Sequence, residues 1–198
     1  MKKYDATILV VDDDANDLHL TERALRHNGV TSPIHLCHDG LEAIAYMMGK
    51  GQYADREKFA YPTFIITDLK MPGADGFAVL EHLKGNPEWA VIPTVVFSGS
   101  QDLDDIKKSY MLGASSYHVK PSSTDALRRQ MKVLHDYWLT CEVPAVDSSG
   151  RHLATDSKGK LGERFTQLSG SLGEARTQPP AEQISKHASH NGSNSGSA

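Results

Sequence analysis

Charged and polar side chains directly follow four of the strands that the sequence predicts. Asp12 and Asp13 follow the first strand, Asp68 the third, Ser98 the fourth and Lys120 the fifth. The carboxyl ends of parallel strands share one edge of a sheet, where ligands and chemistry collect. Carboxylates gathered there repel one another: at an effective dielectric near 20, each pair about 4 Å apart costs roughly 4 kcal/mol. We therefore expect a cation among them.

The residue types at this edge suit phosphoryl chemistry. Carboxylate oxygens that leave room for water molecules suit Mg²⁺, which commonly takes one or two carboxylates together with phosphate oxygens. The ammonium of Lys120 would offset the charge of a tetrahedral anion, and the hydroxyl of Ser98 would donate a hydrogen bond to it. An aspartate carboxylate is an established phosphoryl acceptor. The pattern predicts a phosphoryl group carried by Asp68 beside Mg²⁺.

Each of these residues also has an ordinary structural interpretation. Asp12 to Asp14 could cap the following helix, and we expect Asp14 to do so. Lys120 could be a solvated lysine at a strand end, and Ser98 a loop hydroxyl. Taken singly, the two interpretations are about equally supported. Their joint occurrence at matching strand ends favours a shared site.

The elements that position these residues alternate along the chain. Strands are expected at residues 8–11, 33–37, 64–67, 93–97 and 116–119, and helices at about 16–28, 41–48, 77–84, 102–113 and from 124 onward. Such alternation predicts a parallel sheet with right-handed crossovers and helices on both faces. In the last helix, a stripe of Leu127, Met131, Leu134 and Trp138 is expected to face the core.

The composition excludes several classes of protein. The 198-residue chain is 39% hydrophobic and 23% charged, with a net charge of −4, which argues against a general nucleic-acid binder. Cys37 and Cys141 form no metal-binding pair and indicate a reducing compartment. No signal-peptide core and no apolar run of membrane-spanning length occurs. We expect a cytoplasmic protein with no membrane contact and no direct DNA binding.

The composition changes near Pro144. Residues 144–198 are rich in Ser, Gly, Gln and His and contain one aromatic residue, Phe165. Such a segment cannot bury enough apolar surface to offset the entropy lost on ordering. We therefore expect one folded domain at residues 1–143, followed by a polar, disordered tail at 144–198 without a DNA-binding output domain.

Four stretches resemble the receiver domain of two-component response regulators: Val10 to Asp13, Asp68 to Gly76, Ser98 to Ser100, and Tyr117 to Pro121. The resemblance extends over about residues 7–138. It implies a flavodoxin-like (βα)5 doubly wound α/β fold with a parallel sheet of order 2-1-3-4-5. It also implies that Asp68 takes its phosphoryl group from a phosphohistidine on a sensor histidine kinase.

The resemblance assigns a metal set. Asp13 and Asp68 would bind Mg²⁺ together with the backbone carbonyl of Lys70, and Asp12 would act through a water molecule. Lys70 also puts a cation two residues after the acceptor. The effect of this cation on the lifetime of the phosphoryl group is left open by the sequence.

The resemblance also assigns a switch. Ser98 and Lys120 would hold the phosphoryl oxygens. Tyr117 would rotate into the space that Ser98 vacates when it moves toward the phosphoryl group; the alternative is an ordinary half-buried strand tyrosine. The peptide bond between Lys120 and Pro121 is expected to be cis.

Two further features resemble the small regulators partnered with phytochrome-type histidine kinases. These are the long connection at residues 49–62 and the ending at residues 136–144. In that group the extension after the last helix helps to form a homodimer. Core packing of Tyr137 to Leu139 is an equally supported alternative.

The sequence therefore predicts a single-domain response regulator that signals by protein contact. It would have no small-molecule substrate and no enzymatic activity beyond Mg²⁺-dependent self-phosphorylation and dephosphorylation. The alternatives are a phosphorelay shuttle to a histidine phosphotransfer protein and a non-phosphorylated pseudo-receiver used for docking. A dehalogenase-type phosphatase would need a second aspartate where Lys70 stands. A flavin carrier is disfavoured because Asp12 to Asp14 would repel the FMN phosphate.

Overall fold

The computed structural model describes residues 7–141, which form a five-stranded parallel sheet of order β2-β1-β3-β4-β5. The predicted flavodoxin-like fold is confirmed. The strands are β1 (Ile8–Val11), β2 (Ile34–Cys37), β3 (Phe64–Thr67), β4 (Thr94–Ser98) and β5 (Ser116–Val119). The helices are α1 (Ala15–His27), α2 (Gly40–Met48), α3 (Gly76–Lys84), α4 (Leu103–Met111) and α5 (Thr124–Thr140), with a short 3-10 helix, η1 (Gly51–Ala54). The predicted tail at residues 144–198 lies outside the described residues.

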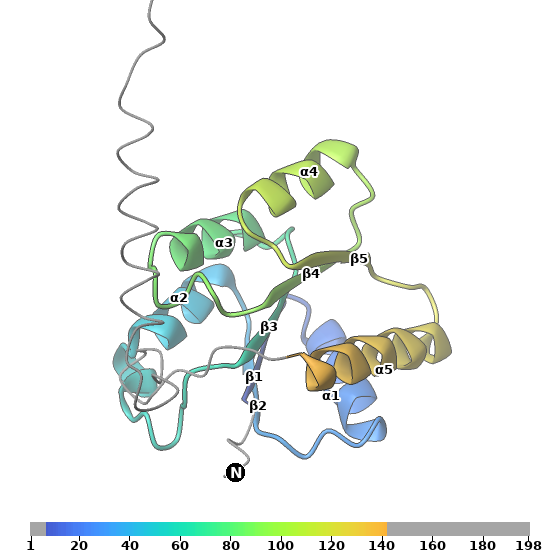
Figure 1. Cartoon of the computed structure of the whole chain (residues 1–198), viewed down its shortest axis with the longest axis horizontal. Helices are drawn as coiled ribbons and strands as arrows, with labels where there is room; N and C mark the ends of the chain where they lie inside the picture. Colours follow the sequence, from blue (N-terminus) through green and yellow to red (C-terminus); the bar gives the residue numbers. More distant parts are fainter. Residues whose placement is uncertain (1–6, 142–198) are drawn as a thin grey trace, which may run out of the picture.

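Helices cover both faces of the sheet. Figure 1 shows α1 and α5 together on one side and α2 and α3 on the other. Alternate side chains of β1 explain this arrangement, because Ile8 and Val10 pack with α1 and α5, whereas Leu9 and Val11 pack with α2 and α3. The central strands are therefore apolar on both faces, as expected for a buried parallel sheet.

Helix α5 carries the predicted apolar stripe. Leu127, Met131 and Leu134 are buried in the core beneath it. The ring of Trp138 packs against that of Phe64, with 5.5 Å between the ring centroids. Tyr137 points away from the core and is 59% exposed. The core-packing interpretation therefore holds for Trp138, whereas Tyr137 lies at the surface and the side chain of Leu139 is outside the described part of the structure.

The long connection before β3 is more ordered than its polar composition suggests. The Arg56 guanidinium donates hydrogen bonds to the backbone oxygens of Met47, at 2.8 Å, and Phe59, at 3.1 Å. It also lies 4.0 Å from the centre of the Tyr61 ring. These contacts hold the connection against the end of α2.

No helix within residues 7–141 combines the length and apolar character needed to cross a lipid bilayer.

Helix boundaries differ slightly from the sequence-based expectations. Helices α2 and α3 begin one residue earlier than expected because Asp39 and Asp75 cap them, leaving Gly40 and Gly76 as the first helical residues. The predicted cap of α1 is confirmed: the Asp14 carboxylate accepts hydrogen bonds from the amides of Asn16 and Asp17. These caps start each helix directly after a strand-end loop.

Candidate functional site

Parallel pairing continues past the strands and brings the predicted site residues together. The amide of Asp68 donates to the carbonyl oxygen of Val11 at 2.9 Å, which sets the end of β3 beside the end of β1. The amide of Lys120 donates to the carbonyl oxygen of Ser98 at 2.9 Å, which sets the end of β5 beside the end of β4. All the predicted strand-end residues therefore lie along one edge of the sheet.

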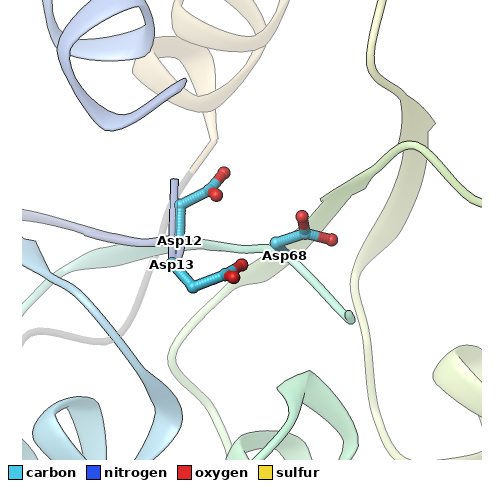
Figure 2. A group of neighbouring side chains, drawn as sticks. All are labelled: Asp12, Asp13 and Asp68. Carbon is cyan, nitrogen blue, oxygen red and sulfur yellow. The ribbon is translucent and has the colours of Figure 1, made fainter. Parts of the chain in front are cut away.

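Three carboxylates form the centre of this edge. One oxygen from each of Asp12, Asp13 and Asp68 lies within 4.8 Å of the others. Figure 2 shows the side chains extending from two neighbouring strand ends, with Asp12 and Asp13 after β1 and Asp68 after β3. Asp12 and Asp68 are buried, whereas Asp13 is exposed. Hard oxygen donors that converge with one side open to solvent fit a divalent cation such as Mg²⁺.

The Lys120 ammonium provides positive charge inside this group. Its Nζ atom lies 2.7 Å from Oδ2 of Asp12, 2.7 Å from Oδ2 of Asp68 and 2.7 Å from Oδ2 of Asp17. These carboxylates raise the pKa of Lys120 against the opposing effect of its burial. Lys120 is therefore a charged ammonium at neutral pH, and its position is set by contacts with two strand ends and one helix.

Asp68 is buried and ionised. Its Oδ1 atom accepts hydrogen bonds from the backbone amides of Leu69 and Lys70, the latter at 3.2 Å, and its Oδ2 atom contacts Lys120. Burial acts to raise the pKa of Asp68, but the hydrogen bonds from Lys120 and Ser98 outweigh it and hold the pKa below its usual value. A carboxylate held in its charged form can act as a nucleophile at neutral pH.

Asp12 behaves differently although it shares the same lysine. Burial raises its pKa to about 6, and the hydrogen bond from Lys120 only partly opposes this. Two carboxylates on one ammonium therefore have their pKa values displaced in opposite directions. Such a separation is common where buried carboxylates share a functional site.

The predicted switch residues lie beside this group. Ser98 is fully buried, and its hydroxyl accepts a hydrogen bond from the Ser100 amide at 3.4 Å. The half-buried Tyr117 donates its hydroxyl to the Ser100 carbonyl oxygen at 2.9 Å. Both side chains thus reach the loop between β4 and α4. Their switching role stays a prediction, as does the cis peptide bond before Pro121.

The side chain of Lys70 points to helix α4. Its Nζ atom lies 2.7 Å from Oδ2 of Asp105, which also accepts a hydrogen bond from the Ser100 hydroxyl at 2.6 Å. The use of the Lys70 carbonyl as a metal ligand stays a prediction.

Two site residues were missed by sequence reasoning: Asp17, which contacts Lys120, and Asp105, which contacts Lys70. Both lie in the first turn of a helix, where an acidic residue is favoured by the helix dipole and so does not indicate a functional site. A lysine with three N–H donors, expected at the same sheet edge as several carboxylates, was the available signal for carboxylate partners.

A parallel α/β fold with an acidic group and a lysine at its carboxyl edge is the arrangement that the resemblance to receiver domains implied. Residues 8–132 match the family model of the response regulator receiver domain. The chain belongs to this family.

Similar proteins and structures include several response regulators. The chain is 32% identical over 139 residues to the response regulator Rcp1 of Synechocystis sp., covering 70% of this chain and 92% of that protein. Its structure resembles the crystal structure of the phosphorylated cyanobacterial phytochrome response regulator RcpA, with a TM-score of 0.66, 33% identity and coverage of 71% of this chain and 99% of RcpA. The Mn²⁺-bound form of Rcp1 gives a TM-score of 0.64 at 32% identity, with coverage of 71% and 99%.

Proposed function

We propose that this chain is a single-domain response regulator of the cytoplasm that accepts a phosphoryl group on Asp68 from a sensor histidine kinase. The observation that carries the proposal is the Asp68 carboxylate. It is buried, ionised, contacted by the Lys120 ammonium at 2.7 Å and grouped with Asp12 and Asp13. The folded domain expected at residues 1–143 stays a prediction, because the described residues are 7–141.

The proposed reaction is a direct phosphoryl transfer. The Oδ2 atom of Asp68, which lies on the Lys120 side, attacks the phosphorus of a phosphohistidine. The O–P bond forms as the N–P bond breaks, and the histidine leaves with the electron pair and takes up a proton. Oδ1 stays fixed by the amides of Leu69 and Lys70. Lys120 and Ser98 then hold the transferred oxygens, so that developing charge meets donors already in place.

The acidic group fits a divalent cation. Asp13, Asp68 and the Lys70 carbonyl would bind Mg²⁺ directly, with Asp12 acting through a water molecule. When bound, Mg²⁺ supplies charge neutralisation for the phosphoryl oxygens. The Mn²⁺-bound structure of the relative Rcp1 supports a divalent cation in proteins of this kind.

The proposed output is a change of surface read by another protein. Loss of the resting contacts of Ser98 would free the loop that also holds the Tyr117 hydroxyl.

The partner kinase is proposed to be of the phytochrome type, because the relative RcpA is described as a phytochrome response regulator. A homodimer is proposed through α5, where Val133 and Tyr137 are 64% and 59% exposed. Light scattering at several protein concentrations tests the dimer.

Intact mass measurement tests the acceptor. The protein is incubated with Mg²⁺ and acetyl phosphate beside the Asp68→Asn variant. We expect one base-labile adduct of about 80 Da on the parent protein, none on the variant, and none with EDTA. An adduct on Asp68→Asn would overturn the assignment of the acceptor.

Further outcomes separate the alternatives. No adduct on the parent protein in the presence of bound Mg²⁺ would favour a pseudo-receiver that only docks. Stoichiometric transfer of the adduct to a histidine phosphotransfer protein would favour a phosphorelay shuttle.

A further inference from the structure

Helix α1 contributes a carboxylate to the lysine of the acceptor site. Oδ2 of Asp17 lies 2.7 Å from the Nζ atom of Lys120, and the Asp17 side chain is 39% exposed. We propose that Asp17 is a positioning residue that holds the Lys120 ammonium in place for phosphoryl transfer to Asp68. This inference rests on the proposed function.

The donors of Lys120 are fully used only when Asp17 is counted. An ammonium group has three N–H donors and accepts no hydrogen bond. Its acceptors are one oxygen each from Asp12, Asp17 and Asp68, all at 2.7 Å. Three contacts from three separate elements fix both the position and the rotation of the group. With two contacts, the third donor would turn toward solvent.

Asp17 differs from the other two partners of Lys120. Asp12 belongs to the acidic group proposed to hold the cation, and Asp68 belongs to it and also carries the proposed phosphoryl group. The contacts of both must therefore change during the reaction. Asp17 is outside that group of three. It is the partner that can keep Lys120 in place before and after transfer.

Because Asp17 is charged, a positioning role and a purely electrostatic role predict opposite effects of its neutralisation on the rate of phosphorylation. A carboxylate beside this site repels an anionic phosphodonor and attracts a cation. If charge alone mattered, Asp17→Asn would speed phosphorylation. If Asp17 acts by holding Lys120, the same variant slows phosphorylation, because the neutral amide oxygen of asparagine holds the ammonium less firmly than a carboxylate does.

The test compares three variants with the parent protein. Asp17→Asn removes the charge at nearly constant shape, and Asp17→Glu restores it on a longer side chain. Glu22→Gln is the matched control, because Glu22 lies on the same helix and contacts Arg26 rather than the site. The rate of adduct formation from acetyl phosphate is measured at saturating Mg²⁺, and Mg²⁺ affinity by calorimetry. A ¹⁵N spectrum of the lysine ammonium groups reports how Lys120 is held.

We expect Asp17→Asn to slow phosphorylation by about fivefold or more, with Mg²⁺ affinity within about twofold of the parent and faster hydrogen exchange at the Lys120 ammonium. Asp17→Glu should recover part of the rate, and Glu22→Gln should match the parent.

An unchanged or faster rate in Asp17→Asn overturns the proposal. If the parent protein takes up no phosphoryl group, the proposed function fails. The Lys120 signal then decides the positioning role alone: faster exchange in Asp17→Asn supports it and unchanged exchange overturns it.

Discussion

The Nζ atom of Lys70 lies 2.7 Å from Oδ2 of Asp105, so an ion pair joins the loop that carries the acceptor to the first turn of helix α4. Asp105 also accepts from the Ser100 hydroxyl, and the carbonyl of Ser100 accepts from Tyr117. A continuous set of contacts therefore links the residue two positions after Asp68 to the predicted switch tyrosine.

Breaking this ion pair should have a small, salt-dependent effect on stability. The Lys70 side chain is largely exposed, so Asp105→Asn should lower the free energy of unfolding by no more than about 1 kcal/mol. The loss should shrink at high ionic strength because salt screens exposed pairs. Urea unfolding at two salt concentrations measures it. Asp104→Asn, in the same helical turn, controls for the helix dipole, and an equal loss in both variants would contradict a specific Lys70–Asp105 contribution.

Replacing Asp13 should weaken Mg²⁺ binding without disturbing the fold. Asp13→Asn removes one charged oxygen from the acidic group, and we expect the dissociation constant for Mg²⁺ to rise by about tenfold or more. Isothermal titration calorimetry measures it. Asp14→Asn is the control, because it removes one negative charge at the adjacent residue while asparagine still caps α1. Equal weakening by the two variants would show that Mg²⁺ affinity depends on the total negative charge near the site and not on Asp13 as a ligand.

The strand-end part of the site was predictable, because it depends on local patterns. The strands β1 and β3 are short apolar runs, and the residue after a parallel strand falls at the carboxyl edge of the sheet. Asp12 and Asp68 follow these runs directly, Lys120 follows the more polar strand β5, and the structure brings the three residues into contact. The family resemblance added the sheet order, which alternation of strands and helices alone does not determine.

The remaining contacts depend on packing between elements distant in sequence. Asp17 meets Lys120 only because α1 starts beside the loop after β5, and the rotation of a helix about its axis cannot be read from its first turn. The order of the connection after α2 depends instead on the direction of one side chain, because Arg56 reaches back to Met47 and stacks on Tyr61. Composition marked that segment as a loop because composition does not reveal the direction of a side chain.

Asp12 should make the metal-free protein less stable as the pH rises. Its pKa is raised to about 6 by burial, so the folded state binds its proton more tightly than the unfolded chain does. Folding is therefore opposed above the folded pKa, and this opposition disappears below the unfolded value of 3.8. Bound Mg²⁺ should cancel the effect by stabilising the charged form.

The Asp12→Asn variant isolates this effect from the other titrating groups. In EDTA, its free energy of unfolding relative to the parent should increase by about 2 kcal/mol between pH 4.5 and pH 7.5. Urea unfolding of both proteins across this range gives the difference. The increase should vanish at saturating Mg²⁺. A difference that stays constant with pH in EDTA would show that Asp12 does not titrate in this window.

Gly76 should tolerate no side chain. A Cβ atom there would collide with the carbonyl oxygen of Asp68 and lie 2.8 Å from Cα of Leu69, and backbone atoms cannot move aside cheaply. We expect Gly76→Ala to lose more than about 2 kcal/mol of stability and to slow adduct formation, because the acceptor loop must shift. A Cβ at Gly99 would meet nothing within 4 Å. Gly99→Ala should therefore stay within about 0.5 kcal/mol of the parent in the same unfolding assay.

Removing the Ser98 hydroxyl should separate phosphorylation from the change of surface. Ser98 is fully buried beside Asp68, and its hydroxyl holds the amide of Ser100, the residue whose carbonyl binds Tyr117. In Ser98→Ala the acceptor, Lys120 and the acidic group remain, so adduct formation should continue at a reduced rate. The loop has lost the hydroxyl that the phosphoryl group would attract, so Tyr117 should stay in its resting position.

A fluorinated tyrosine placed only at position 117 reports this by ¹⁹F NMR, with and without acetyl phosphate. The parent protein should show a new signal on phosphorylation, and Ser98→Ala should carry the adduct with no such signal. Ser116→Ala is the control, because the Ser116 hydroxyl is buried and makes no hydrogen bond within the described residues. A full signal change in Ser98→Ala would mean that Tyr117 responds to the phosphoryl group by another route, such as the contacts from Lys70 through Asp105 to Ser100.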